Sequence, residues 1–461
     1  MLLPAQSYEE ACRTFRWRIP PHYNQSFDLC DRHTLGGADG HRTALIVELG
    51  DGLPAERYSF LTLRRLAGRL GAVLAALGVE PGDRVAVSLP QSLEAAVTLL
   101  AVPRMGAVLV PLPAAWDAET VAAVLETEAP KVAIVHRKRA LELSVTRIVP
   151  HLLAVGGDPA LLGGEGMADF WAALEGAGDV SGPALTHADD PAMAIHCGLG
   201  LLPGESVLHA HRAVLGNLPA VEYALDFLPR SGDVMWTSWD WMSFEGAYWA
   251  LFPAWHHGVP VLAAPPFQPN GGLDWMAANG VRVAVLPPGH LAALAEAAAK
   301  RSHTMPRALA TGPDPLSPEL SELVQVVFGV TANEIWGVAA TGALAANNPK
   351  VTETRPGSPG RMLPGICVEA ASLATGKLLP ADAPGILSAS PNLPGQCLVG
   401  PGTRFGPGWP GTGWTGSRDL DGYVLPDARA GVDMPVPEIP KPIQPDDPPL
   451  RLDGPSPDER W

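Results

Sequence analysis

The stretch of the sequence most suggestive of chemistry is a glycine-spaced segment over residues 197–206, near the middle of the chain. It follows a short apolar run and precedes a run with helical character, an arrangement typical of phosphate-binding loops. In such loops, backbone N–H groups and the start of the helix hold an anion. Hydroxyl residues and a lysine normally assist, but here the only charged residue is Glu205 and the only hydroxyl is that of Ser206. The sequence therefore predicts a nucleotide-binding loop that has lost its nucleotide.

The size and charge of the chain narrow its class. With 461 residues, of which 47% are hydrophobic, the chain is long enough for two or three packed lobes. Acidic residues outnumber basic ones by 48 to 32, and the net charge of −16 disfavours nucleic acid and anionic lipid as partners. No uncharged apolar run reaches the length that a bilayer requires, so we expect no membrane span.

The five cysteines are scattered and show no CxxC or clustered His/Cys spacing. This pattern argues against a zinc site and against a disulfide framework, so we expect no metal centre. The first residues also lack the basic and then apolar pattern of a signal peptide. These features together predict a cytoplasmic protein.

The elements that would position the loop follow an alternation of helices and strands. Between residues 60 and 136, helical apolar spacing alternates with short apolar runs, as in a helix over 60–77 and a strand over 85–89. Ser92 is a candidate to cap the next helix, which is predicted to run to about Met105. A weaker alternation runs from 211 to 310, starts with a helix over 211–223 directly after the loop, and includes a helix over 244–257. Strands separated by single helices predict an α/β fold with parallel sheets covered on both faces.

The two ends of the chain have a different character. Residues 1–50 show no clear periodicity and are predicted to be irregular. Ten of the last 36 residues are proline, mixed with acids, which predicts a disordered tail. The predicted division is a first α/β subdomain over 1–190, a second over 191–355, a small β lobe over 356–425 and the proline-rich tail over 426–461.

Seven segments occur in a characteristic order: W-R-I-P-P-H-Y-N at 17–24, G-V-E-P-G-D-R-V-A-V-S-L-P-Q at 78–91, V-L-H-A-H-R-A at 207–213, W-D-W-M at 239–242, H-H-G-V-P-V at 256–261, N-E-I-W-G at 333–337 and R-P-G-S-P-G-R at 355–361. Together they resemble the adenylate-forming superfamily, most closely its acetyl-CoA and medium-chain acyl-CoA synthetase branch. The resemblance implies a large N-terminal domain with two doubly wound α/β subdomains and a small β-barrel. It also implies an ancestral reaction that uses ATP, magnesium and CoA to convert a carboxylate, through an acyl-adenylate, into a thioester.

The resemblance indicates which residues of the family's phosphate loop have been replaced in this chain. The family's phosphate loop reads T-S-G-T-T-G-x-P-K-G, and Cys197, Gly198 and Gly200 stand where it has hydroxyl residues. The loop contains a proline, Pro203, the lysine is replaced by Glu205, and the last glycine by Ser206. Every hydroxyl that would hold pyrophosphate is replaced, and the sign of the charge at the lysine position is reversed.

The family's second motif, Y-G-x-T-E, supplies an aromatic ring for adenine and a glutamate for magnesium. Here Trp336 keeps the aromatic ring and Gly337 the glycine, but Ala340 replaces the glutamate. A hard cation would lose an oxygen ligand by this change.

Two further nucleotide motifs are altered. The ribose-binding T-G-D corresponds to Thr415, Gly416 and Ser417, so the aspartate is replaced. The adenine-flanking G-G-E is partly kept as Gly312 and Asp314. In the family, a C-terminal lid domain with the adenylation lysine follows, whereas here we expect the proline-rich tail and no lid domain.

Other residues have both a functional and a structural interpretation. In the family, the region over 239–246 borders the acyl pocket, so Trp239, Asp240 and Trp241 are candidates to line one, with a core role equally open. The pairs His209/His211 and His256/His257 have metal-like spacing, but structural roles are favoured. The glycines over 411–416 match G-x-G-x-x-G without closing a βαβ unit, which argues against a dinucleotide site.

Two functional hypotheses follow. The favoured one is a pseudoenzyme with no cofactor that retains a small carboxylate, acyl or adenosine-like ligand, or binds a protein partner through its proline-rich tail. The alternative is a diverged acid–CoA ligase or acyl transferase with low activity or a lid supplied by a partner. The loop itself could also be an ordinary connection that binds nothing.

Overall fold

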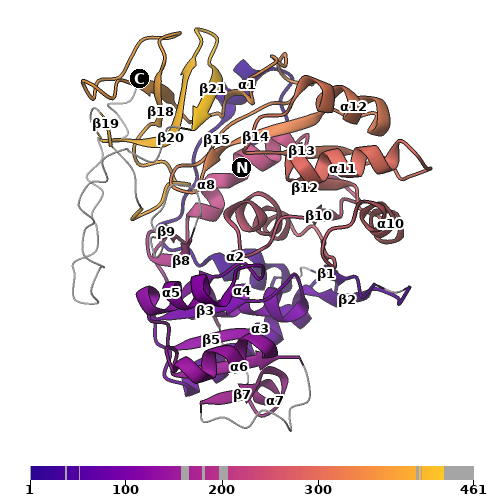
Figure 1. Cartoon of the computed structure of the whole chain (residues 1–461), viewed down its shortest axis with the longest axis vertical. Coiled ribbons are helices and arrows are strands. Elements are labelled where there is room, and N and C mark those ends of the chain that lie inside the picture. The colour runs from indigo at the N-terminus through magenta and orange to yellow at the C-terminus, as the bar shows by residue number, and fades with distance from the viewer. Residues whose placement is uncertain are drawn as a thin grey trace.

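The computed structural model describes residues 2–36, 39–50, 52–156, 166–178, 182–196, 206–400, 404–405 and 408–429 (Figure 1). Five residues of the predicted loop (Cys197, Gly198, Gly200, Pro203 and Glu205) lie outside this part of the chain, as does the proline-rich tail after residue 429. None of the helices in the described part is long and apolar enough to cross a membrane.

The first sheet, in the lower part of Figure 1, has seven strands in the order β7-β6-β5-β3-β4-β8-β9. All neighbours are parallel except β8 and β9, which pair antiparallel at one edge. The strands are β3 (Arg84–Ser88), β4 (Val108–Pro111), β5 (Val132–His136), β6 (His151–Val155), β7 (Met167–Asp169), β8 (Pro191–Ile195) and β9 (Val207–Ala210).

Helices cover both faces of this sheet. Because neighbouring strand residues point to opposite faces, Val85 and Val87 pack with one set of helices and Ala86 with the other. The first set is α3 (Phe60–Ala76), α4 (Leu93–Arg104) and α7 (Phe170–Glu175), and the second is α5 (Ala118–Glu128) and α6 (Arg137–Thr146). Side-chain caps begin the helices: Ser92 accepts from the N–H of Ala95 at the start of α4, as its position in the sequence predicted.

The second sheet begins with a parallel part in the middle of Figure 1. Its parallel strands are β1 (Thr43–Val47), β10 (Met235–Thr237), β11 (Val261–Ala263), β12 (Val283–Leu286), β13 (Ala308–Thr311) and β14 (Ala332–Val338), and β2 (Glu56–Ser59) pairs antiparallel at the edge. One face carries α8 (Ala213–Ala224), η3 (Gly246–Leu251) and α9 (Phe252–His256), and the other α10 (Pro269–Asn279), α11 (Pro288–Ala298) and α12 (Pro318–Phe328).

A β lobe, at the top of Figure 1, continues the second sheet without a break. The antiparallel pairing of β14 with β15 (Gly342–Ala346) joins the parallel part to this lobe. The remaining strands are β16 (Gly360–Met362), β17 (Val368–Ala371), β18 (Gly385–Ala389), β19 (Arg404–Phe405), β20 (Trp409–Arg418) and β21 (Tyr423–Arg429). The predicted fold class, two α/β units plus a small β lobe, is confirmed, while the residue boundaries of the predicted domains stay predictions.

One local prediction was wrong, and two predicted helices are confirmed with small differences. Residues 1–50 contain α1 (Tyr8–Thr14), α2 (Gln25–Leu29), η1 (Asp31–Thr34) and β1, so they are not irregular. The helix predicted over 211–223 begins at Ala213, after the extra strand β9. The helix predicted over 244–257 is present, but it contains a π-helical segment, η3, before α9.

Candidate functional site

The strands that flank the predicted loop form a β-hairpin. Ile195 of β8 is paired with Val207 of β9, so the chain enters and leaves the loop on neighbouring antiparallel strands. The predicted strand-to-helix connection is therefore wrong, because four strand residues intervene before α8. The favourable field of a helix N-terminus acts mainly within its first turn. The start of α8 is thus not the direct anion-binding end that the sequence predicted.

Glu128, the last residue of α5, contacts both ends of this hairpin loop. Its Oε1 lies 3.1 Å from Nε2 of His196, and its Oε2 lies 2.7 Å from Nε of Arg84. Ser206 also hydrogen-bonds to the carboxylate. Burial acts to raise the pKa of Glu128, but His196, the charge of Arg84 and Ser206 together hold this pKa below its ordinary value. A buried carboxylate thus fixes the residues on either side of the predicted loop.

Sequence reasoning singled out Ser206 but missed its partners Glu128, His196 and Arg84. The signal was present in part, since His196 is a polar residue at the end of an otherwise apolar strand. A buried histidine requires a partner. The identity of that partner depends on the packing of α5 against the sheet, which the local sequence does not show.

The turn that carries Ala340 lies close to the same hairpin. A segment after β18 bridges the two: Leu208 of β9 donates its N–H to the carbonyl of Val399 (2.7 Å), and Leu398 returns a hydrogen bond of the same length to Leu208. Two residues earlier than Val399, the N–H of Cys397 donates to the carbonyl of Ala340 (3.2 Å). The structure therefore brings the second motif beside the hairpin. Within the described residues, no cluster of three or more His, Cys, Asp or Glu has a geometry suited to a metal ion.

Trp336 lies in the interior of the β lobe. Its side chain is 0% exposed and packs among Leu344, Leu387 and Trp414, with its ring centroid 6.5 Å from that of Trp414. Its indole N–H has no hydrogen-bond partner among the described residues. This environment is that of a core residue, and the predicted contact with an adenine ring stays a prediction.

Three glycines of the nucleotide motifs have structural reasons to be glycine. A Cβ on Gly312 would lie 2.0 Å from the carbonyl oxygen of Ile335, and one on Gly337 would lie 2.2 Å from that of Gly342. A Cβ on Gly416 would lie 2.2 Å from the carbonyl oxygen of Leu425. These distances are far below van der Waals contact, so close backbone packing alone requires these glycines.

The loop after β13 carries Gly312 and Asp314 and is held by a residue that sequence reasoning missed. Glu334 of β14 is paired with Thr311, and its Oε1 accepts a hydrogen bond from the N–H of Leu316 (2.9 Å). Burial raises the pKa of Glu334 to about 7. Asp314 lies on the exposed outer side of this loop.

The third motif lies on β20, where Thr415 and Ser417 are half-buried and Ser417 is paired with Leu425 of β21. The next residue, Arg418, is bound at two nitrogens by Glu369, each at 2.8 Å. Bidentate pairing with a carboxylate neutralises this guanidinium. The cation beside the third motif is therefore already engaged within the protein.

The candidate acyl-pocket residues follow β10 and face the first sheet. Asp240 accepts hydrogen bonds from the N–H groups of Ala114 (3.1 Å) and Met242 (2.9 Å), and burial raises its pKa. Trp241 is 0% exposed, whereas Trp239 is half-buried. The structure thus supports a core role for Trp241 and leaves the pocket role of Trp239 and Asp240 as a prediction.

Next to these residues is a buried aromatic cluster that the sequence did not assign. The ring of His209 lies 5.4 Å from that of Phe244 and 5.2 Å from that of Tyr248. Burial, assisted by the charge of Arg212, lowers the pKa of His209 to about 3, so the imidazole is neutral. His209 and His211, for which structural roles were favoured, have separate environments: His209 lies in this cluster, and His211 Nδ1 accepts from the N–H of Gln25 (3.2 Å).

His256 and His257 each have a carboxylate partner. His256 Nδ1 lies 2.6 Å from Asp28, and His257 Nε2 lies 2.9 Å from Glu222. The two rings are nearly perpendicular, and their partners belong to different helices, α2 and α8. The structural interpretation of this pair is supported.

The chain is similar to known proteins over most of its length. Residues 37–393 match the family model described as AMP-binding enzyme. Acetyl-coenzyme A synthetase of Bacillus subtilis (strain 168) is 25% identical over 379 residues, which cover 78% of this chain and 65% of that protein. Acetyl-coenzyme A synthetase 2 of Zygosaccharomyces bailii is 26% identical over 452 residues, 88% of this chain and 66% of that one. The chain thus spans just under two thirds of the length of these relatives.

Solved structures agree in fold. An acyl-CoA synthetase of Brucella canis superposes with a TM-score of 0.82 at 24% identity, covering 91% of this chain and 79% of that chain. The anthranilate CoA ligase AuaEII in complex with anthranoyl-AMP gives a TM-score of 0.78 at 19% identity, covering 89% and 79%. At these identities, the likeness establishes the fold.

Proposed function

Because the chain belongs to the AMP-binding enzyme family, we propose that it is an acyl-CoA synthetase-like pseudoenzyme, unable to adenylate carboxylates and kept for a binding or regulatory role. The relatives named acetyl-coenzyme A synthetase suggest that its ancestor acted on a small carboxylate.

The observation that carries the proposal is Ala340. The alanine methyl group stands where the family has a magnesium-binding glutamate, in the turn that packs beside the β8–β9 hairpin. Magnesium is bound through oxygen ligands, which a methyl group cannot supply. Phosphoryl chemistry depends on the metal to neutralise charge, so this one replacement removes a support for the reaction. The hydroxyl of the next residue, Thr341, donates to the carbonyl of Gly342 (3.1 Å).

Two other replacements act in the same direction. Ser417 stands for the ribose-binding aspartate, and Glu205 places a carboxylate where the family has a lysine for the phosphates. A carboxylate repels an anionic ligand, whereas a lysine attracts it. Groups that act as a unit in catalysis fail as a unit, so we expect the combined loss to abolish adenylation.

We propose that the retained ligand is a small carboxylate, acyl or adenosine-like molecule, bound near Trp239 and Asp240 without ATP, magnesium or CoA. A protein partner that docks on the proline-rich tail is a further part of this proposal. Both suit a regulatory or scaffolding role.

The test is ATP–pyrophosphate exchange with short- and medium-chain fatty acids. We expect no exchange above background, and we expect Glu205→Lys alone not to restore it, because Ala340 and Ser417 remain. Clear exchange that persists through purification and is lost in a Glu205→Gln variant would instead establish the alternative, a diverged acid–CoA ligase.

A further inference from the structure

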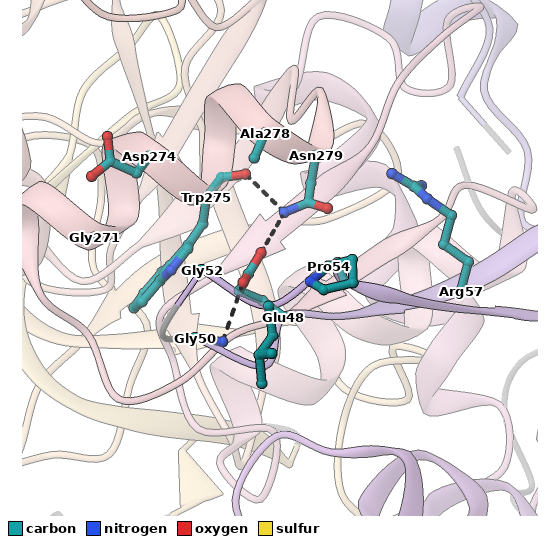
Figure 2. A pocket seen from close by; sticks show the side chains of 12 residues that line it. Glu48, Gly50, Gly52, Pro54, Arg57, Gly271, Asp274, Trp275, Ala278 and Asn279 are labelled. Atoms are coloured by element: carbon teal, nitrogen blue, oxygen red, sulfur yellow. Dashed lines mark hydrogen bonds between the residues drawn. The ribbon is translucent and has the colours of Figure 1, made fainter.

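A hollow of about 580 Å³ opens on the far edge of the second sheet, between α10 and the loop that connects β1 to β2 (Figure 2). Its lining contains none of the residues assigned to the nucleotide motifs or to the candidate acyl pocket. Charged and aromatic side chains surround it: Glu48, Arg57, Asp274 and Trp275. The volume is within the range of sites that bind small molecules.

The floor of the hollow is a carboxylate held in one orientation. Glu48 Oε1 accepts from the N–H of Gly50 (3.2 Å), and Oε2 accepts from the side-chain amide of Asn279 (2.9 Å). The same amide nitrogen also donates to the carbonyl of Trp275 (3.1 Å), so both of its hydrogens are used and Asn279 cannot rotate freely. A carboxylate can accept about four hydrogen bonds, so each oxygen keeps acceptor capacity for a ligand.

An indole ring forms the wall beside this carboxylate. Figure 2 shows Trp275 extending from α10, and Trp275 and Glu48 both line the hollow. The ring lies against Gly271, where an added Cβ would be 3.0 Å from its edge. The glycine therefore lets the indole lie close to the helix backbone. An indole next to a fixed carboxylate is a combination that binds organic cations, through cation–π attraction and charge-assisted hydrogen bonds.

The remaining charges favour the same ligand. Asp274 lies at one end of the hollow and Arg57 at the other (Figure 2). Asp274 is already paired with Arg301. With Asp274 neutralised by Arg301, Glu48 and Arg57 remain as lining charges of opposite sign, and the net charge of −16 of the chain favours approach of a cation over approach of an anion. We propose that this hollow is a binding site for a primary ammonium or guanidinium group, which sits against Trp275 and donates to Glu48.

The test is calorimetric titration of the full chain with n-butylammonium and n-butylguanidinium, with butyrate and n-butanol as the anionic and neutral controls. We expect both cations to bind with dissociation constants of about 1 mM, and the controls to bind at least tenfold more weakly. Glu48→Gln keeps the acceptor for Asn279 and should weaken cation binding by about tenfold or more. Trp275→Leu should weaken cation binding by about two- to fivefold. If Glu48→Gln does not fold, the Trp275→Leu variant still tests the same site.

Glu322→Gln, at an exposed acidic residue of α12, is the matched control and should bind as the unchanged chain does. An acetylated and amidated Gly-Lys-Gly peptide identifies the source of the cation. Binding tighter than that of n-butylammonium assigns the site to a basic side chain of a polypeptide, and equal or weaker binding assigns it to a free amine. Cation binding no tighter than that of the controls, or unchanged in Glu48→Gln, would overturn the proposal.

Discussion

The Glu128 carboxylate and the His196 imidazole lie 3.1 Å apart in the interior, one at the end of α5 and the other at the end of β8. Because Ser206 hydrogen-bonds to the same carboxylate, this contact links both ends of the predicted phosphate loop to one helix. The loop's flanks are therefore held by a buried acid rather than by the start of a helix.

We expect Glu128→Gln to destabilise the fold by about 1–3 kcal/mol, because Arg84 and His196 then lose a charged partner in a buried setting. Urea unfolding measures the change. Glu126→Gln, at an exposed position of the same helix, should change stability by less than about 0.5 kcal/mol. Since the pKa of Glu128 is lowered in the folded state, its contribution is present above the ordinary value of 4.5 and is lost as the pH falls below it. A difference between variant and parent that stays constant from pH 6 to pH 3 would contradict this assignment.

The pH dependence that we predict for the contribution of Glu334 to stability is opposite to that of Glu128. The pKa of Glu334 is raised to about 7 from 4.5, so the folded state holds a proton that the unfolded state has already lost. Its contribution is therefore favourable below about pH 4.5 and is lost as the pH rises to 7. We expect Glu334→Gln, which keeps an acceptor for Leu316, to gain up to about 3 kcal/mol relative to the parent between pH 5 and pH 8. Urea unfolding at pH 5 and at pH 8 measures this gain. If the free energies of unfolding of variant and parent differed by the same amount at both pH values, the raised pKa of Glu334 would be contradicted.

Burial of Trp336 separates a core role from a ligand-binding role. We expect Trp336→Ala to destabilise the β lobe by about 3–5 kcal/mol, because the ring packs among apolar side chains at 0% exposure. Trp336→Phe should cost much less, since it retains most of the volume. Thermal and urea unfolding compare the two variants. Normal stability in Trp336→Ala, with only ligand binding lost, would show that the ring is presented to a ligand instead.

Stabilisation of the fold by added ligands can show whether the chain has lost only the binding of the triphosphate or the binding of the whole nucleotide. We expect AMP or a short acyl-AMP to raise the melting temperature and Mg-ATP to leave it unchanged, because Ala340 and Glu205 oppose the metal and the phosphates. Differential scanning fluorimetry over a concentration series is sufficient. A shift with Mg-ATP larger than that with AMP would refute the proposed loss.

The sequence predicted the α/β alternation well where periodic runs are long, as in α3 and α4, and where a capping residue such as Ser92 marks a helix start. It failed for β1 and β9. The four residues of β9 carry no periodicity that separates strand from helix, and their conformation depends on pairing with β8. The motif positions could be predicted from resemblance, but the contacts of Glu128 and Glu334 could not, because each joins residues distant in the sequence.

Gly312 provides the sharpest test of the close packing between the nucleotide-motif loop and β14. A Cβ at this position would lie 2.0 Å from the Ile335 carbonyl oxygen, and the backbone has a φ of +144°, which side chains other than that of glycine rarely adopt. We expect Gly312→Ala to lower stability by more than about 3 kcal/mol or to give insoluble protein, since both the contact and the conformation are unfavourable. The matched control is Gly289→Ala in α11, where an added Cβ meets nothing within 4 Å and a small gain from helix propensity is expected. Soluble expression and urea unfolding compare the two variants, and equal stability would show that the loop does not pack against β14 as described.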